Sequence, residues 1–446
     1  DLNPGAGFVS QLCHEPRVAL AVLEAMIAPY RSAGSLTVLL DTVPVSAEVN
    51  RDRVTAVTFR NTLDPDIVTT VEAGMVLDAT ENGDLLPMTG CEWVTGAEAQ
   101  HEHDEPSAPL EADPNDIQGF TFCFAVDHRP GEQHVIDRPV DYGFWREYRP
   151  DFWPGPLLGF SAPEPRTLQA VERTFSPELA DEPLDVMADQ SKDGRDLELW
   201  LFRRILAHGL FRPGSIRSDI VLVNWPMNDY WLGRLIDVDE ATKQEHLRQA
   251  RQLSLSLLYW LQTEAPRSDG GTGHPGLRLR GDVTDGPEGL AKAPYIRESR
   301  RIRALNTVTE NDVSQAVVGP RGATRYPDSV GVGSYRIDLH PSTAGRNYLD
   351  IASAPFEVPL GALVPRRIRN LLPASRNIGT THITNGCYRL LPVEWNVGEA
   401  AGALAGFSLA HQTEPQAVHA GKHLDEFLTG LERAGVERHW PDVRGY

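Results

Sequence analysis

His340 and His382 are the side chains best suited to acid–base chemistry in this 446-residue chain, because imidazole titrates near neutral pH. Arg297 and Arg300 lie in an arginine-rich segment, and guanidinium groups can bind a substrate carboxylate through two parallel hydrogen bonds. Glu298 lies between them, so a structural ion-pair cluster explains the same segment equally well. A purely structural role is also open for each histidine. The pattern therefore predicts either an anion pocket with a proton acceptor or a network of paired charges.

A long helix is predicted from Pro392 to about Ala410, directly after these residues. Its glycines, Gly398, Gly402 and Gly406, fall on one stripe. An interior glycine costs a helix about 1 kcal/mol relative to alanine. We therefore expect the stripe to face another backbone or a flat ligand at close range. Ordinary helix packing with small residues is the alternative explanation.

Metal and thiol chemistry receive little support. The segment 101–105 offers histidine and carboxylate ligands, but no distant partner is identifiable, so a solvated linker is favoured over a metal site. The four cysteines are scattered without a C-x-x-C spacing, which indicates reduced, buried thiols and favours a cytoplasmic location. Cys13 beside His14 is interpreted as a buried or loop cysteine and not as a nucleophile.

The first ninety residues alternate between helical and extended patterns. A helix is predicted from Pro16 to about Tyr30, with proline suited to its first turn. The apolar run that follows predicts a buried strand, and two alternating segments around the polar turn 50–53 predict a hairpin. Strands are expected over 36–40, 43–49, 54–59, 68–71 and 74–78.

The middle of the chain is rich in proline and aromatic residues. Helices are predicted over 196–208 and 242–263, with a strand between them over 219–225 and a mobile loop over 267–289. The last third returns to short strands, expected over 334–339, 356–359 and 371–372.

Composition excludes several classes of partner. The formal charge of −20 opposes nucleic-acid binding, which requires clustered Lys and Arg. No run of eighteen apolar residues and no signal-peptide pattern is visible, so no membrane partner is expected. A small-molecule substrate is the expected partner.

Two segments carry a family resemblance. Residues 76–85, Val-Leu-Asp-Ala-Thr-Glu-Asn-Gly-Asp-Leu, resemble the strand and turn of FAD-dependent oxidoreductases of the glutathione-reductase-like flavoprotein class, with Glu81 and Asn82 replacing the usual Gly-Asp. Residues 371–402 resemble the closing flavin-binding motif of that family. Weaker likenesses occur over 3–5, 13–17, 294–302 and 331–340.

The resemblance implies FAD as the cofactor and an α/β fold. It places the turn after residue 78 beside the FAD phosphates and adenosine, the strand holding Val43 beside the adenine, and the closing strand and helix over the isoalloxazine and pyrophosphate. The flavin ring is expected between 382–389 and 297–301, where His382 and Asn385 would touch flavin or substrate. An arginine of 297–301 would hold an anionic substrate, with His340 as the alternative proton acceptor. The cofactor-binding residues implied are Val43, Ala79, Thr80, Gly83, Asp84, Arg376, Gly379, Asn385, Gly386, Arg389, Pro392 and Gly398.

One family feature is missing from these residues, since no G-x-G-x-x-G follows a strand. The resemblance implies that this turn lies upstream of Asp1 or on a separate chain. Assembly of the protein as a homo-oligomer is a further open alternative. The expected fold is thus a Rossmann-like FAD-binding domain, incomplete at its N-terminus, with an inserted α+β substrate or cap domain. The expected ranges are 1–112 and 331–412 for the FAD domain, 113–330 for the cap and 413–446 for a helical tail.

The predicted function is hydride transfer from a small molecule to flavin N5. Two alternatives stay open. A carbohydrate-active lyase or hydrolase would use the Trp- and Tyr-rich middle segment to stack on sugars. A non-catalytic or split-enzyme fragment would explain the missing turn.

Overall fold

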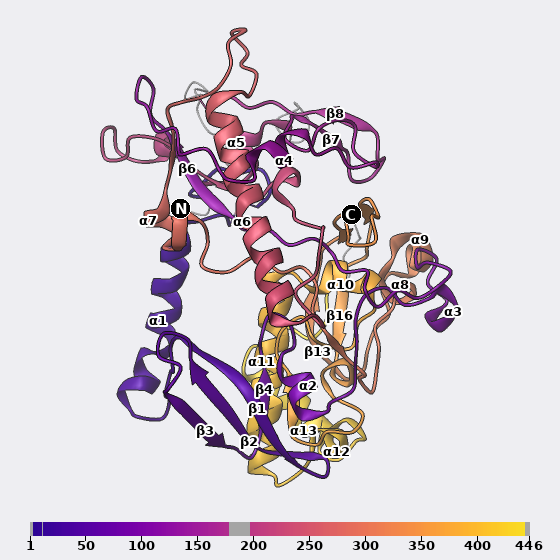
Figure 1. Ribbon diagram of the computed structural model, residues 1–446. Coiled ribbons are helices and arrows are strands. Elements are labelled where there is room, and N and C mark those ends of the chain that lie inside the picture. The colour runs from indigo at the N-terminus through magenta and orange to yellow at the C-terminus, as the bar shows by residue number, and fades with distance from the viewer. Residues whose placement is uncertain (1–2, 11, 178–196, 442–446) are drawn as a thin grey trace. The chain divides into compact units, whose positions relative to one another are not determined.

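The computed structural model describes residues 3–10, 12–177 and 197–441 (Figure 1). The chain packs into two compact units. The first unit contains 1–38, 119–233 and 238–295, and the second contains 39–118, 234–237 and 296–446. Each unit is assembled from separate stretches of sequence. The predicted domain ranges, which divide the chain at other points, stay a prediction.

The first unit is built around one long helix and an antiparallel sheet. Its helices are α1 (Pro16–Ser32), α4 (Tyr142–Glu147), α5 (Leu199–Phe202), α6 (Glu240–Thr263) and α7 (Gly281–Thr284), with 3₁₀ turns η3 (His208–Leu210), η4 (Pro226–Asn228) and η5 (Pro287–Gly289). Its strands are β6 (Phe124–His128), β7 (Ser161–Pro163), β8 (Ala170–Glu172), β9 (Arg204–Leu206), β10 (Ile220–Val223) and β11 (Leu277–Leu279).

The four-stranded sheet of this unit has the order β11-β6-β10-β9, and every neighbouring pair is antiparallel. β6 is buried along its whole length because it lies between two neighbours. The predicted helix 242–263 is confirmed as α6, which buries Leu253, Leu257 and Leu261. The predicted strand 219–225 is confirmed as β10.

Two other expectations for this unit differ from the structure. The helix predicted over 196–208 is wrong where it is described: α5 has four residues, and the chain then forms β9, because the β10 edge offers backbone partners to Arg204 and Leu206. Residue 196 itself lies outside the described residues. The loop predicted over 267–289 contains β11, α7 and η5, since β11 pairs with β6.

The predicted helix from Pro16 is confirmed as α1, although none of its residues is buried. The buried strand predicted over 36–40 is wrong, because the segment is assigned to no strand and Leu40 is 73% exposed. β-prone residues form a strand only where a neighbouring edge supplies hydrogen bonds, and none of the described strands pairs with this segment.

The second unit combines short sheets with a C-terminal helical layer. Its helices are α2 (Leu85–Thr89), α3 (Gln100–His103), α8 (Glu310–Val313), α9 (Gln315–Val318), α10 (His382–Tyr388), α11 (Leu391–Ala410), α12 (Pro415–His419) and α13 (Leu424–Arg433), with 3₁₀ turns η6 (Gly319–Arg321) and η7 (Leu360–Leu363). Its strands are β1 (Thr42–Asn50), β2 (Arg53–Asn61), β3 (Val68–Glu72), β4 (Val76–Asp78), β5 (Trp93–Val94), β12 (Arg301–Ile302), β13 (Ser329–Gly333), β14 (Ile337–Leu339), β15 (Leu349–Ile351), β16 (Phe356–Pro359) and β17 (Leu371–Pro373).

The predicted hairpin is confirmed as β1 and β2, and β3 extends it into a three-stranded antiparallel sheet. β4 and β17, which lie almost three hundred residues apart in sequence, pair in parallel, with Leu372 opposite Leu77. The strands predicted over 356–359 and 371–372 are confirmed as β16 and β17, and that over 334–339 begins later, as β14.

The predicted long helix is confirmed as α11, which lies against β13 and β17. Its buried face is formed by Val393, Val397, Ala401 and Leu404. Of the two explanations for the glycine stripe, close approach of another backbone is wrong at Gly402 and Gly406, where a Cβ would meet no described atom within 4 Å, whereas at Gly398 a Cβ would lie 3.4 Å from the Ala374 carbonyl oxygen. The flat-ligand explanation stays a prediction. The helix turns its branched residues to the core, which leaves Gly402 and Gly406 exposed and Gly398 half-buried.

Candidate functional site

The candidate site begins at the carboxyl ends of the parallel strands β4 and β17. The carbonyl oxygen of Asp78 at the end of β4 accepts hydrogen bonds from the Ala374 N–H at 2.8 Å and from Nδ2 of Asn377 at 3.0 Å. These bonds fix the two connecting segments, 79–84 and 374–381, beside each other. In open α/β sheets, ligands bind at this end of parallel strands.

The turn from Thr80 to Asp84 is held from inside by the buried Asp78 carboxylate. Its oxygens accept hydrogen bonds from the Thr80 N–H at 3.0 Å, the Thr80 hydroxyl at 2.7 Å and the Leu85 N–H at 3.1 Å. Burial raises the pKa of Asp78 in spite of these bonds. Gly83 adopts φ +64°, and a Cβ there would lie 3.1 Å from the Arg300 carbonyl oxygen. The turn therefore needs glycine at this position.

Arg300 secures the same turn from outside. Its Nη1 donates to the Asn82 carbonyl oxygen at 3.0 Å, and its guanidinium pairs with Asp237 at 2.9 Å and Asp84 at 3.5 Å. Of the two explanations open for the arginine segment, the structure thus supports the ion-pair cluster for Arg300. Its guanidinium holds the turn that was expected to carry the FAD phosphates.

Arg376 is similarly engaged. It pairs with Glu394 in the first turn of α11 at 2.7 Å and with Glu81 at 2.9 Å, and it donates to the Ile296 carbonyl oxygen. A carboxylate thus already lies at the positive end of α11, where a diphosphate or flavin edge was expected. Burial raises the pKa of Glu394, with Arg376 opposing it. Arg376 therefore joins the turn after β4 to the start of α11.

A buried charge network forms the centre of the site. Nδ1 of His382, the first residue of α10, lies 2.8 Å from Oε1 of Glu298, and the His382 N–H donates to Glu98 at 2.9 Å. Arg301 is fully buried between the same two carboxylates, at 2.6 Å from Glu298 and 2.8 Å from Glu98. Burial opposes protonation of His382, but the adjacent Glu298 carboxylate outweighs it and raises the pKa of this imidazole.

Several buried polar atoms around this network have no hydrogen-bond partner among the described residues, and two of them bear on the cofactor. These two are Oδ1 of Asn385, one turn along α10 from His382, and Nε2 of Gln118. Asn385 uses its Nδ2 to donate to the Arg297 carbonyl oxygen at 2.9 Å, and the Gln118 N–H donates to Glu298 at 3.1 Å. One unsatisfied acceptor and one unsatisfied donor match the N–H and C=O groups of a flavin pyrimidine edge. This part of the site fits the cofactor.

A second ionic group adjoins the network at β14. Asp338 lies 3.5 Å from Nε2 of His340 and 3.3 Å from Nη2 of Arg389. Burial by itself would raise the pKa of Asp338, but the charges of His340, Arg389 and Arg297 outweigh it and hold this pKa well below its usual range. Oε1 of Gln118 accepts from the His340 N–H at 3.2 Å, so Gln118 connects the two groups.

The remaining expected cofactor residues are spread over the same unit. Val43 lies half-exposed on β1, Ala79 is exposed in the turn after β4, and Pro392 lies exposed in the first turn of α11. A Cβ on Gly386 would lie 3.0 Å from the Asp338 N–H nitrogen, one on Gly379 2.4 Å from Cβ of Ala304, and one on Gly398 3.4 Å from the Ala374 carbonyl oxygen. Their roles toward FAD stay predictions.

Sequence reasoning missed Glu98, Gln118 and Asp338. Nothing in their local sequence distinguishes them, because each enters the site through pairing of distant segments: β5 with β12 for Glu98, the bridge to Ser342 for Gln118, and β14 against α10 for Asp338. Glu298 was foreseen as an ion-pair partner within its own segment, but its contact with His382 crosses 84 residues.

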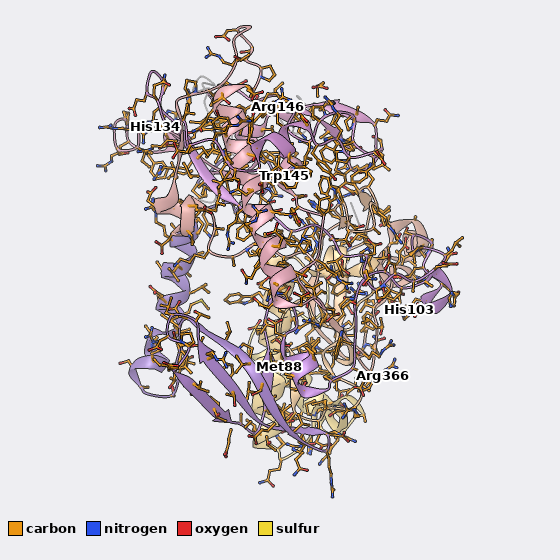
Figure 2. The ribbon with its side chains drawn as sticks, in the orientation of Figure 1. Met88, His103, His134, Trp145, Arg146 and Arg366 are labelled. Carbon is orange, nitrogen blue, oxygen red and sulfur yellow. The ribbon has the colours of Figure 1, made fainter. Side chains whose placement is uncertain are left out.

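The aromatic residues of the middle segment lie mostly inside the first unit. Trp145, labelled on α4 in Figure 2, is 1% exposed, and Trp153, Trp225 and Trp231 are also buried. Rings in a core cannot stack on a polysaccharide. This removes the observation that motivated a carbohydrate-active enzyme.

Comparison with known proteins agrees with this chemistry. The family model described as FAD dependent oxidoreductase matches residues 3–428. Comparisons with curated proteins and with solved structures gave no match. No helix of the described residues is long and apolar enough to cross a membrane. The parallel β4–β17 pair, the turn at its carboxyl end and the match over most of the sequence lead to one conclusion: the chain belongs to the FAD dependent oxidoreductase family and is an enzyme that uses FAD.

Proposed function

We propose that the protein oxidises a small anionic molecule by hydride transfer to FAD, and that the network around His382 forms the catalytic face. When bound, FAD supplies the hydride acceptor, N5 of its isoalloxazine. The observation that carries the proposal is the buried pair of His382 and Glu298, 2.8 Å apart, beside the unsatisfied Asn385 and Gln118.

His382 is proposed as the proton acceptor. Glu298 accepts a hydrogen bond from Nδ1 of His382, and this bond fixes the imidazole ring. Nε2 of His382 is then left to take the proton that a substrate hydroxyl or amine loses when its carbon gives up hydride. The carboxylate also favours the protonated ring, so that His382 holds this proton after the transfer. Arg301 pairs with both Glu298 and Glu98 and so balances their negative charge.

Asn385 and Gln118 are proposed to orient the flavin. Their free acceptor and donor can pair with an N–H and a C=O of its pyrimidine ring, and the turn 80–84 with Asp78 would hold the phosphate side. Arg297, a buried arginine of the segment expected to hold an anionic substrate, is the proposed substrate anchor. The assignment of the middle segment as a cap, the glutathione-reductase-like subclass and a cytoplasmic location belong to the same proposal.

The first experiment tests the cofactor site. Purified protein is supplied with FAD, and bound flavin is measured from its visible absorbance after gel filtration. We expect Asn385→Ala to weaken FAD binding, while Asn311→Ala, which removes an amide outside the network, leaves it unchanged. Equal FAD affinity in both variants would contradict the proposed orientation.

The second experiment tests the proton acceptor. Flavin reduction is followed by stopped flow with small hydroxy and amino acids as trial substrates. We expect His382→Gln to slow reduction by about 10²–10⁴-fold, the usual contribution of a general base, and the exposed control His101→Gln to leave it unchanged. His340→Gln tests the alternative acceptor. If both site variants reduce flavin at the parental rate, the assignment is wrong.

A further inference from the structure

A pocket of about 630 Å³ opens in the second unit, and it shares no residue with the candidate FAD site. Its wall is made by the segment 319–325 after α9, by Ala354, Pro355 and Glu357 around the start of β16, and by Trp440. The volume is in the range of pockets that hold small organic molecules, which is about 300–1,000 Å³.

The arginine-bearing segment of this pocket is fixed at both ends. Nε2 of Gln315 donates to the Gly319 carbonyl oxygen at 3.1 Å, and Gly319 and Gly322 both adopt positive φ, which lets the chain turn sharply. At the other end, the Thr324 hydroxyl donates to Asp312 at 2.9 Å. The turn is thus prearranged and does not have to be ordered by a ligand.

The aromatic wall is fixed as well. Nε1 of Trp440 donates to the carbonyl oxygens of Gly333 at 3.0 Å and Phe356 at 3.1 Å, so the indole is anchored by its polar edge. Ala323 and Pro355 add small apolar surfaces to the same pocket. These residues form the apolar part of a mixed lining, and this part suits a flat or compact hydrocarbon body.

The charges of the pocket are unevenly matched. Among the described lining residues the carboxylate is Glu357, which is buried and already accepts from the Tyr326 N–H at 2.8 Å and contacts Nδ1 of His439 at 2.9 Å, while Arg325 lies 3.8 Å from it. Arg321 has no hydrogen bond or ion pair within the described part of the chain. A guanidinium that has no partner among the described residues, beside the apolar part of the lining, leaves a local positive charge on a protein whose net charge is −20.

We propose that this pocket binds an organic carboxylate with an apolar body, with Arg321 pairing the carboxylate and Trp440 contacting the body. Guanidinium groups bind carboxylates through two parallel hydrogen bonds, which gives direction as well as affinity. Because Arg321 is exposed, the binding weakens as salt concentration rises.

Benzoate is the probe, with benzamide as its neutral isostere, and both are titrated into FAD-supplemented full-length protein by calorimetry. We expect benzoate to bind more tightly than benzamide. Arg321→Gln should weaken benzoate binding at least tenfold, whereas the exposed control Arg433→Gln, on α13 outside the pocket, should leave it unchanged. His382→Gln should also leave it unchanged, since His382 lies outside this pocket.

Three results would overturn the proposal. The first is no benzoate binding at millimolar concentration, and the second is equal affinity for benzamide. The third is binding that survives Arg321→Gln or is lost in His382→Gln, which would assign the carboxylate to another site. Arg321 is exposed and pairs with none of the described residues, so its replacement tests the pocket without disturbing the described fold.

Discussion

Glu105 makes the stability of the second unit depend on pH. Its side chain is 1% exposed, and Oε1 accepts from the Thr381 hydroxyl and the Glu310 N–H, both at 2.6 Å. Thr381 is the N-cap of α10, the helix that carries His382. Burial is the main cause that raises the pKa of Glu105 from 4.5 to about 7, with the nearby carboxylates of Glu98 and Glu310 adding to it.

The sign of the effect follows from proton binding. Between pH 4.5 and about 7 the unfolded chain loses the Glu105 proton while the folded protein keeps it, so the free energy of unfolding falls as pH rises through this window. Each pKa unit corresponds to about 1.4 kcal/mol, which gives a total loss of about 3 kcal/mol. Below pH 4.5 the stabilising contribution is fully present.

Glu105→Gln imitates the neutral carboxyl group, keeps an oxygen for both hydrogen bonds and cannot ionise. We expect the stability of this variant relative to the parent to increase by about 2–3 kcal/mol between pH 5 and pH 8. Urea unfolding at several pH values measures the difference, and hydrogen exchange of the α10 amides shows whether the gain lies at this helix. Glu111→Gln removes an exposed carboxylate as a control. A difference between Glu105→Gln and the parent that does not change with pH would refute the reasoning.

Two further predictions concern the site's framework. Arg301→Met leaves the buried Glu298 and Glu98 without the guanidinium that pairs with both, and it should lower the free energy of unfolding by about 3–5 kcal/mol. The exposed control Arg433→Met should change this free energy little. Similar urea midpoints for the two variants would count against a shared charge network. Gly83→Ala places a Cβ 3.1 Å from the Arg300 carbonyl oxygen at φ +64°, whereas Gly345→Ala at φ +72° meets no described atom within 4 Å. The Gly83 variant should therefore lower the free energy of unfolding by more than the roughly 1 kcal/mol expected from φ alone, and it should also bind FAD more weakly. Equal changes in melting temperature for the two variants would show that the close approach to Arg300 does not matter.

The sequence pattern was sufficient to predict an element wherever the backbone N–H and C=O groups of a segment find their partners within that segment or across a short turn. The helices α1, α6 and α11 and the β1–β2 hairpin were predictable because their hydrogen bonds run within the segment or across a short turn. The residues of 76–85 and 371–402 likewise identified the family from sequence, and with it the cofactor, as the family match over 3–428 confirms.

Tertiary structure alone decided the contacts that join distant segments. The local sequence does not distinguish the segment Leu36–Leu40, which forms no strand, from β17, which is buried beside β4. A segment becomes a strand only where the edge of another strand supplies hydrogen-bond partners. The same holds for charge: the sequence placed Arg300, Arg301 and Glu298 together, but their partners Asp237, Glu98 and His382 come from other parts of the chain. Whether an arginine is committed to a carboxylate depends on which side chains the fold brings within about 3 Å of it, a distance set by packing and not by sequence separation.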